Sequence, residues 1–65
     1  MIPNLLDTRR THWRITIERP NGTSWVCDRP EQEQTAANAA ALIEFYSLHP
    51  EGALEAIRLY SKALT

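Results

Sequence analysis

The stretch that decides the fold is HWRITIERPNGTSWVCDR, residues 12–29. Large apolar and polar side chains alternate along both of its halves, and this period of two is typical of half-buried β-strands. Between the halves stand Pro20, Asn21 and Gly22. Proline pre-sets φ for the first turn position, and glycine supplies the left-handed conformation that follows. The sequence therefore predicts a β-hairpin closed by a three-residue loop with a glycine bulge.

The length of this loop fixes the strand register. A three-residue loop pairs Arg19 with Thr23. Counting outward, the expected pairs are Ile17 with Trp25, Ile15 with Cys27, Trp13 with Arg29 and Arg14 with Asp28. A two-residue loop would instead place Trp25 opposite Glu18 and mix apolar with charged side chains. We therefore expect one apolar, buried face and a second face that carries an Arg14–Asp28 ion pair.

Residues 29–48 predict a helix. Asp28 is a suitable N-cap, with Glu31 three residues later and Pro30 in the first turn. Pro50 ends the helix, because the residue before a proline avoids the α region. Two apolar stripes run along it: Ala36, Ala39, Leu42, Ile43 and Tyr46 form the first, and Ala37, Ala41, Phe45 and Leu48 form the second. We expect the first stripe to cover the hairpin and the second to receive a further element.

Residues 50–64 fit two descriptions. The polar side chains of Glu51, Glu55, Arg58 and Lys62 fall in one narrow wedge of a helical wheel, which favours a second helix and a ββαα fold. The alternative is a third strand over residues 54–61, which gives a ββαβ fold but mixes charged and apolar side chains on each face. Residues 55–64 are similar to the second helix of a tetratricopeptide repeat. The stretch occurs once, whereas repeat arrays need several copies, so the similarity indicates a helix and no family.

Length and composition limit the class of protein. A chain of 65 residues holds one core, and its formal net charge is −1. Its single cysteine excludes an internal disulfide and a cysteine-rich zinc site, which favours a cytoplasmic setting. The sequence contains neither an apolar run that spans a membrane nor a signal-peptide pattern. We expect one small α+β domain over residues 12–65, preceded by an N-terminal arm over residues 1–11, in the cytoplasm and without membrane contact.

Residues capable of catalysis are few and scattered. Cys27 is expected on the buried face of the hairpin, where it serves as a small apolar residue. His12 and His49 lie at element boundaries and have no metal-ligand spacing. The two glycines, Gly22 and Gly52, cannot form a phosphate-binding loop. The sequence therefore predicts a protein that is not an enzyme, with no catalytic residue, no cofactor and no metal.

A basic region offers one function for the N-terminal half. Its members are Arg9, Arg10, His12, Arg14, Arg19 and Arg29. Two-stranded ribbons can read the major groove of DNA, and arginine is the usual reader. Glu18 and Asp28 interrupt the region, so a nucleic-acid-binding regulator is the second hypothesis rather than the first.

Surplus apolar surface supports the first hypothesis. A helix over residues 50–64 would leave apolar side chains exposed on both flanks of its polar wedge, and Leu54, Leu59 and Ala63 are the expected interface. We therefore predict a protein–protein interaction module that forms a homodimer or binds another protein. It would be a small regulatory protein or inhibitor that occupies a partner surface. Products of phages and mobile elements that block host enzymes are often of this size class.

Overall fold

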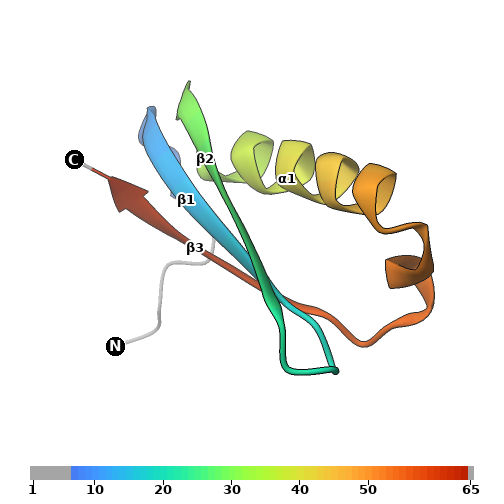
Figure 1. The fold of residues 1–65 in the computed structure, drawn as a ribbon. Coiled ribbons are helices and arrows are strands. Elements are labelled where there is room, and N and C mark those ends of the chain that lie inside the picture. The colour runs from blue at the N-terminus through green and yellow to red at the C-terminus, as the bar shows by residue number, and fades with distance from the viewer. Residues whose placement is uncertain (1–6, 65) are drawn as a thin grey trace.

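The computed structural model describes residues 7–64, which form a three-stranded antiparallel sheet with one α-helix across one face (Figure 1). The elements follow the order β1 (Thr11–Glu18), β2 (Ser24–Gln32), α1 (Gln34–Leu48), the short 3-10 helix η1 (Pro50–Leu54) and β3 (Arg58–Leu64). The strand order in the sheet is β2-β1-β3, so β1 is central and the other two strands are edges. The α+β class and the ββαβ topology are confirmed, and the ββαα prediction with a helix over residues 50–64 is wrong. The third strand spans Arg58–Leu64 rather than the predicted residues 54–61, because Pro50–Leu54 form η1.

The hairpin register agrees with the prediction. Cross-strand partners include Ile17 with Trp25, Ile15 with Cys27, Trp13 with Arg29 and Arg14 with Asp28. At the loop, the Arg19 N–H donates to the Thr23 carbonyl at 2.9 Å. Gly22 has φ of +89°, a conformation that glycine adopts without steric cost. The local turn chemistry and the apolar alternation therefore select the same register.

The last element is a strand because β1 needs partners on both of its edges. Backbone N–H and C=O groups inside a fold must be hydrogen-bonded, and β2 serves only one edge of β1. β3 serves the other, from Glu18 opposite Arg58 to His12 opposite Leu64. Ser61 stands among apolar residues on the inner face of β3, and its hydroxyl accepts a bond from Gln34 Nε2 at 2.8 Å. A polar residue at this position is therefore compatible with a strand.

Helix α1 begins five residues later than predicted. Asp28 does not cap it, since its carboxylate accepts two bonds from Arg14 across the hairpin, at 2.8 and 3.0 Å. β2 instead continues to Gln32, whose carbonyl accepts a bond from Trp13 Nε1 at 2.8 Å. The N-cap is Glu33, without a side-chain capping bond. Contacts with β1 thus prevail over a local capping signal, while the end of the helix at Leu48 is as predicted.

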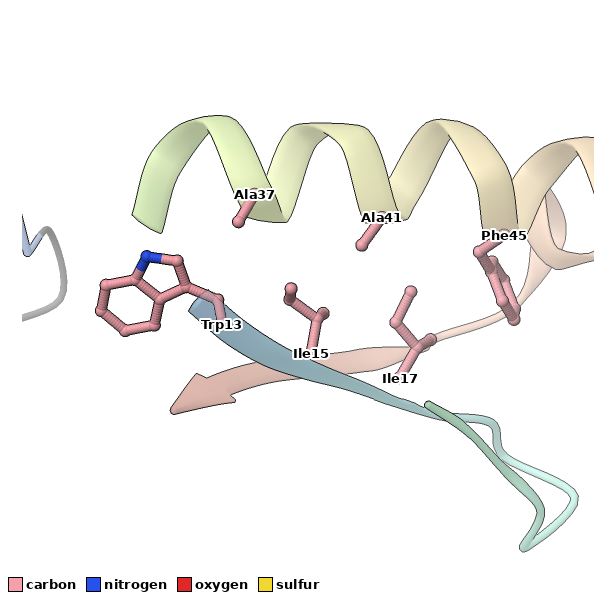
Figure 2. Close-up of a cluster of buried hydrophobic side chains, with 6 residues drawn as sticks. All are labelled: Trp13, Ile15, Ile17, Ala37, Ala41 and Phe45. Atoms are coloured by element: carbon pink, nitrogen blue, oxygen red, sulfur yellow. The ribbon is translucent and has the colours of Figure 1, made fainter. Parts of the chain in front are cut away.

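The core lies between β1 and α1 (Figure 2). Its fully buried members are Trp13, Ile15 and Ile17 from β1, and Ala37, Ala41 and Phe45 from α1. The second helix stripe, and not the first as predicted, therefore covers the sheet, and the first stripe is mostly exposed, with Ile43 at 70%. Alanines on the inner stripe let the helix backbone approach the sheet closely, and the edge of the Phe45 ring packs against Trp25 at 5.7 Å between centroids.

Close packing also explains the glycine in η1. A Cβ on Gly52 would lie 2.6 Å from Phe45 Cε2, so any larger residue would displace the ring. His49 also stacks on the Phe45 ring, with ring centroids 4.8 Å apart. The chain is thus turned back from the end of α1 towards the start of β3.

Part of the predicted N-terminal arm joins the domain. Residues 1–6 lie outside the described residues, and β1 begins at Thr11. Asp7 is held by the buried Gln34: its N–H donates to Gln34 Oε1 at 2.8 Å, and its carbonyl accepts the Gln34 N–H at 3.3 Å. Gln34 therefore links Asp7, α1 and β3.

Within residues 7–64, no helix has the length and apolar character needed to cross a bilayer.

Candidate interaction surface

No helix or strand within residues 7–64 covers the face of the sheet opposite α1, which we call the open face. It carries His12, Arg14, Thr16 and Glu18 from β1, Ser24, Val26 and Asp28 from β2, and Arg58, Tyr60 and Lys62 from β3. Val26 and Tyr60 lie on either side of Thr16 in one cross-strand row. Their exposed fractions are 52% and 53%, so this row forms an apolar strip between charged side chains.

Ion pairs neutralise much of the charge on the open face. Arg14 bonds to both carboxylate oxygens of Asp28, and this interaction lowers the pKa of Asp28. Arg58 pairs with Glu18 at 3.1 Å. Both pairs are well exposed, so each contributes little to stability.

A less exposed ion-pair cluster lies where the hairpin loop meets the start of β3. Arg19, 14% exposed, bonds to Glu55 at 2.6 and 3.0 Å and to Glu51 at 3.1 Å. Its bond lowers the pKa of Glu55, and the pKa of Arg19 is raised in return. A forked guanidinium that binds two carboxylates fixes the geometry of the segment that leads into β3.

Beside this cluster, an open hollow of about 320 Å³ lies under the hairpin loop. Its charged lining residues, Glu18, Arg19 and Arg58, are all held in the ion pairs described above. The hollow therefore offers no unpaired charge to hold a ligand.

The six residues predicted to contact nucleic acid are spread over the molecule. Arg14 and His12 lie on the open face, whereas Arg19 is at the loop and Arg29 lies on the inner side of β2 next to α1. Four of them are ion-paired: Arg9 with Asp7, Arg14 with Asp28, Arg19 with Glu55, and Arg29 with Glu44. Within the described residues, Arg10 and His12 have no ion-pair partner. The structure does not gather these side chains into one patch.

Cys27 and His49, the candidate catalytic side chains, lie in packed surroundings. Cys27 is half-buried, and burial raises the pKa of its thiol, which disfavours the nucleophilic thiolate. His49 places Nδ1 3.3 Å from the Phe45 carbonyl at the end of α1. Among residues 7–64, no three His, Cys, Asp or Glu side chains are grouped as metal ligands.

The three predicted interface residues fall in two places. Leu54 ends η1 and is 94% exposed. Leu59 and Ala63 lie instead on the inner face of β3, half-buried against the core and opposite Ile17 and Trp13 of β1. Leu59 and Ala63 therefore belong to one edge of the sheet, and Leu54 does not.

Hydrogen-bond direction along β1 can be derived from the loop. Because the Arg19 N–H donates to Thr23, Arg19 directs its backbone groups towards β2. Successive residues of a strand direct these groups to opposite edges, so Glu18, Thr16 and Arg14 direct theirs towards β3.

The same alternation determines which groups of β3 remain free. The residues opposite that set are Arg58, Tyr60 and Lys62, which therefore exchange their bonds with β1. Leu59, Ser61 and Ala63 direct their N–H and C=O groups away from the sheet. Within residues 7–64 no further strand pairs with them. We call this row of outward backbone groups the β3 edge.

Sequence reasoning missed the β3 edge and Tyr60, because it predicted a helix there. The signal that identifies a strand is the alternation of Arg58, Tyr60 and Lys62 with smaller or apolar residues. This alternation competes with the helical wedge, which the side-chain pattern favours.

Comparisons with protein-family models, with curated proteins and with solved structures find no match to this chain.

Proposed function

We propose that this domain is a protein–protein interaction module that acts by strand addition at the β3 edge. An extended segment of a partner would pair there as a fourth strand, a mode in which backbone bonds supply affinity and side-chain sites supply specificity. The module would regulate or inhibit its partner by occupying a surface, without turning over a substrate.

The observation that carries this proposal is the outward row of backbone groups on β3, with which no strand of residues 7–64 pairs. Edge strands with unpaired groups are templates for pairing, and proteins commonly protect them with proline, bulges or covering elements. β3 contains no proline or glycine, and its register with β1 is regular along its whole length. Half-buried Leu59 and Ala63 on one face and exposed Tyr60 on the other lie where a partner strand would place its own side chains.

The charges of the molecule favour a protein partner over nucleic acid. Phosphate binding draws its affinity from Lys and Arg side chains that release counterions. In this structure Arg14, Arg19 and Arg29 would first have to leave carboxylate partners. The nucleic-acid hypothesis therefore becomes an outcome of the test below.

The test compares two exposed positions on the same open face. A benzophenone-bearing phenylalanine is incorporated at Tyr60 on β3 or, as the matched control, at Val26 on β2, and the cells of origin are irradiated. We expect defined protein crosslinks from the Tyr60 position and few from Val26. The crosslinked protein is identified by mass spectrometry, and its binding is measured with purified components.

A second pair of variants tests the backbone itself. Ser61→Pro removes an outward N–H, whereas Ser61→Ala removes only the hydroxyl. Binding of the identified protein should be lost in the first and kept in the second. Equal crosslinking from both positions, recovery of nucleic acid in place of protein, or binding that survives Ser61→Pro would overturn the proposal.

A further inference from the structure

We propose that the strand which adds to the β3 edge is β3 of a second copy of this chain, paired antiparallel about Ser61. The inference rests on the proposed function, because it names a partner for the same edge. Most soluble homo-oligomers close with a two-fold axis, and a two-fold axis requires a surface that is complementary to itself.

Hydrogen-bond direction restricts the registers in which two β3 strands can pair. Outward groups belong to Leu59, Ser61 and Ala63, and an antiparallel ladder must place outward residues of one strand opposite outward residues of the other. A symmetric pair then has its axis at a single residue position of β3. Only axes at Tyr60, Ser61 or Lys62 overlap most of the strand, since axes at Leu59 or Ala63 limit the overlap to Arg58–Tyr60 or Lys62–Leu64.

Charge separates the three remaining registers. With the axis at Tyr60, Arg58 faces Lys62 of the second copy, and the exposed Arg58–Glu18 pair at 3.1 Å offsets only part of this repulsion. With the axis at Lys62, the two copies of that lysine face each other. Like charges directly opposite one another destabilise a strand pair, so both registers are disfavoured.

The register about Ser61 avoids this repulsion. Arg58 faces Leu64 of the second copy, and Tyr60 faces Lys62 of the second copy on the open face. An ammonium group beside an aromatic ring is a favourable contact. A lysine on an edge strand usually discourages pairing with another strand. Here Lys62 disfavours two of the three registers and leaves the one about Ser61.

The inner face is compatible with the same arrangement. Leu59 faces Ala63 of the second copy, so a large side chain meets a small one. Both are half-buried in the single chain and pack against the core. Their apolar surface would become further covered as the sheet grows to six strands, which adds hydrophobic burial to the backbone bonds.

The first experiment measures the mass in solution by sedimentation equilibrium at chain concentrations from about 1 to 200 µM. This range detects dimers with dissociation constants of roughly micromolar or weaker. We expect twice the chain's 7.4 kDa at the upper end. Ser61→Pro should remain at 7.4 kDa, while Ser61→Ala should still dimerise. Circular dichroism melting of both variants checks that the fold persists.

The second experiment tests the register with exposed substitutions that do not depend on tolerance of proline. Tyr60→Lys places a positive charge opposite Lys62 of the second copy, and Tyr60→Glu places a negative charge there. We expect the dimer dissociation constant to rise about tenfold in the first and to fall severalfold in the second. The difference should shrink in 1 M salt, where the Debye length is about 3 Å.

The outcomes separate this inference from the proposed function. A monomer throughout the concentration range, a dimer unaffected by a folded Ser61→Pro variant, or equal effects of Tyr60→Lys and Tyr60→Glu would overturn the self-pairing. If a different protein still crosslinks at Tyr60 in those cases, the proposed function stands with another partner. If the probe at Tyr60 crosslinks neither to a second copy of this chain nor to another protein, the self-pairing and the proposed function are both wrong.

Discussion

The two edge strands of the sheet, β2 and β3, differ in how their outward backbone groups are protected from pairing. On β2 the outward positions include Pro30, which has no N–H to offer, and the register with β1 shifts between Thr11 and Trp13. A bulge and a proline on the free side are common means of protecting an edge. β3 has neither and runs in regular register from Arg58 to Leu64. Within the part of the chain that the structure describes, the β2 edge is therefore protected at Pro30 and at the register shift, whereas the β3 edge has no such protection.

The anchoring ion pairs show the same asymmetry. The pair that joins β2 to β1, Arg14–Asp28, has both side chains about half-exposed. Arg19 and Glu55, which fix the approach to β3, are 14% and 24% exposed. The edge that no strand within residues 7–64 pairs with is therefore the one whose approach is held by the more sheltered ion pair. An edge must be rigid before it can serve as a template at low entropic cost.

The largest expected effect tests which backbone groups face outward. Tyr60→Pro removes an N–H that bonds to β1, so the free energy of unfolding should fall by roughly 2–4 kcal/mol, the cost of a lost bond and an unpaired acceptor. In Ser61→Pro the free energy of unfolding should fall by much less, because the N–H that is removed faces outward. Urea denaturation measures both. A reversed order would show that Leu59, Ser61 and Ala63 face β1 and would remove the β3 edge.

A smaller effect is expected from the two anchoring carboxylates. In the fold the pKa of Glu55 lies below its ordinary value of 4.5, so its stabilising contribution is complete above that pH and is lost as the pH falls through the folded value. Glu55→Gln should lower the melting temperature at pH 7 more than Asp28→Asn does.

The pH profile supplies the control for this comparison. The melting temperature of the wild type should decline below about pH 4.5, and that of Glu55→Gln should decline less, so the two curves converge in acid. The pKa of Asp28 is likewise lowered from its ordinary value of 3.8, so its contribution to stability is also lost in acid. This contribution is smaller because the Arg14–Asp28 pair is exposed. Parallel curves for the wild type and Glu55→Gln would contradict the anchoring role.

Removing the protection of the β2 edge should have a modest effect on stability and a visible one on association. Pro30→Thr restores an outward N–H and loosens the unfolded chain, so the free energy of unfolding should fall by about 0.4–1 kcal/mol. Light scattering should detect species larger than a dimer at high concentration. Unchanged mass would mean that the register shift alone closes this edge.

The smallest effect is expected at Leu54. This side chain is 94% exposed on η1 and lies off β3. Leu54→Ser should change the free energy of unfolding by less than about 0.5 kcal/mol and should leave the dimer mass unchanged. A loss of dimer in this variant would move the interface from β3 to η1.

Prediction from sequence succeeded where the deciding interactions are local. The hairpin register follows from Pro20, Asn21 and Gly22 together with the alternation on both strands, and all of this lies within 18 consecutive residues, 12–29. Prediction failed at Asp28, where a capping signal was outweighed by its bond to Arg14. It also failed for the helix stripe that faces the sheet, since both stripes are apolar.

The interface predicted from the sequence shares two residues with the candidate surface described above. Leu59 and Ala63 were selected as surplus apolar residues on a helix, and the structure places both on a sheet edge. Their role as an interface remains a prediction. Tyr60 and the outward backbone groups were not predicted, because a backbone edge leaves no pattern in side-chain chemistry.

The sequence by itself determined the hairpin, its register and the end of the helix at His49-Pro50, because each depends on neighbours along the chain. Only the tertiary structure decided that residues 58–64 form a strand. Their side-chain pattern by itself favours a helix, so the choice of a strand depended on the unpaired backbone groups on the second edge of β1. That requirement exists only once the hairpin has formed. Once β3 meets it on β1, no strand among the described residues 7–64 remains to pair with the outer edge of β3.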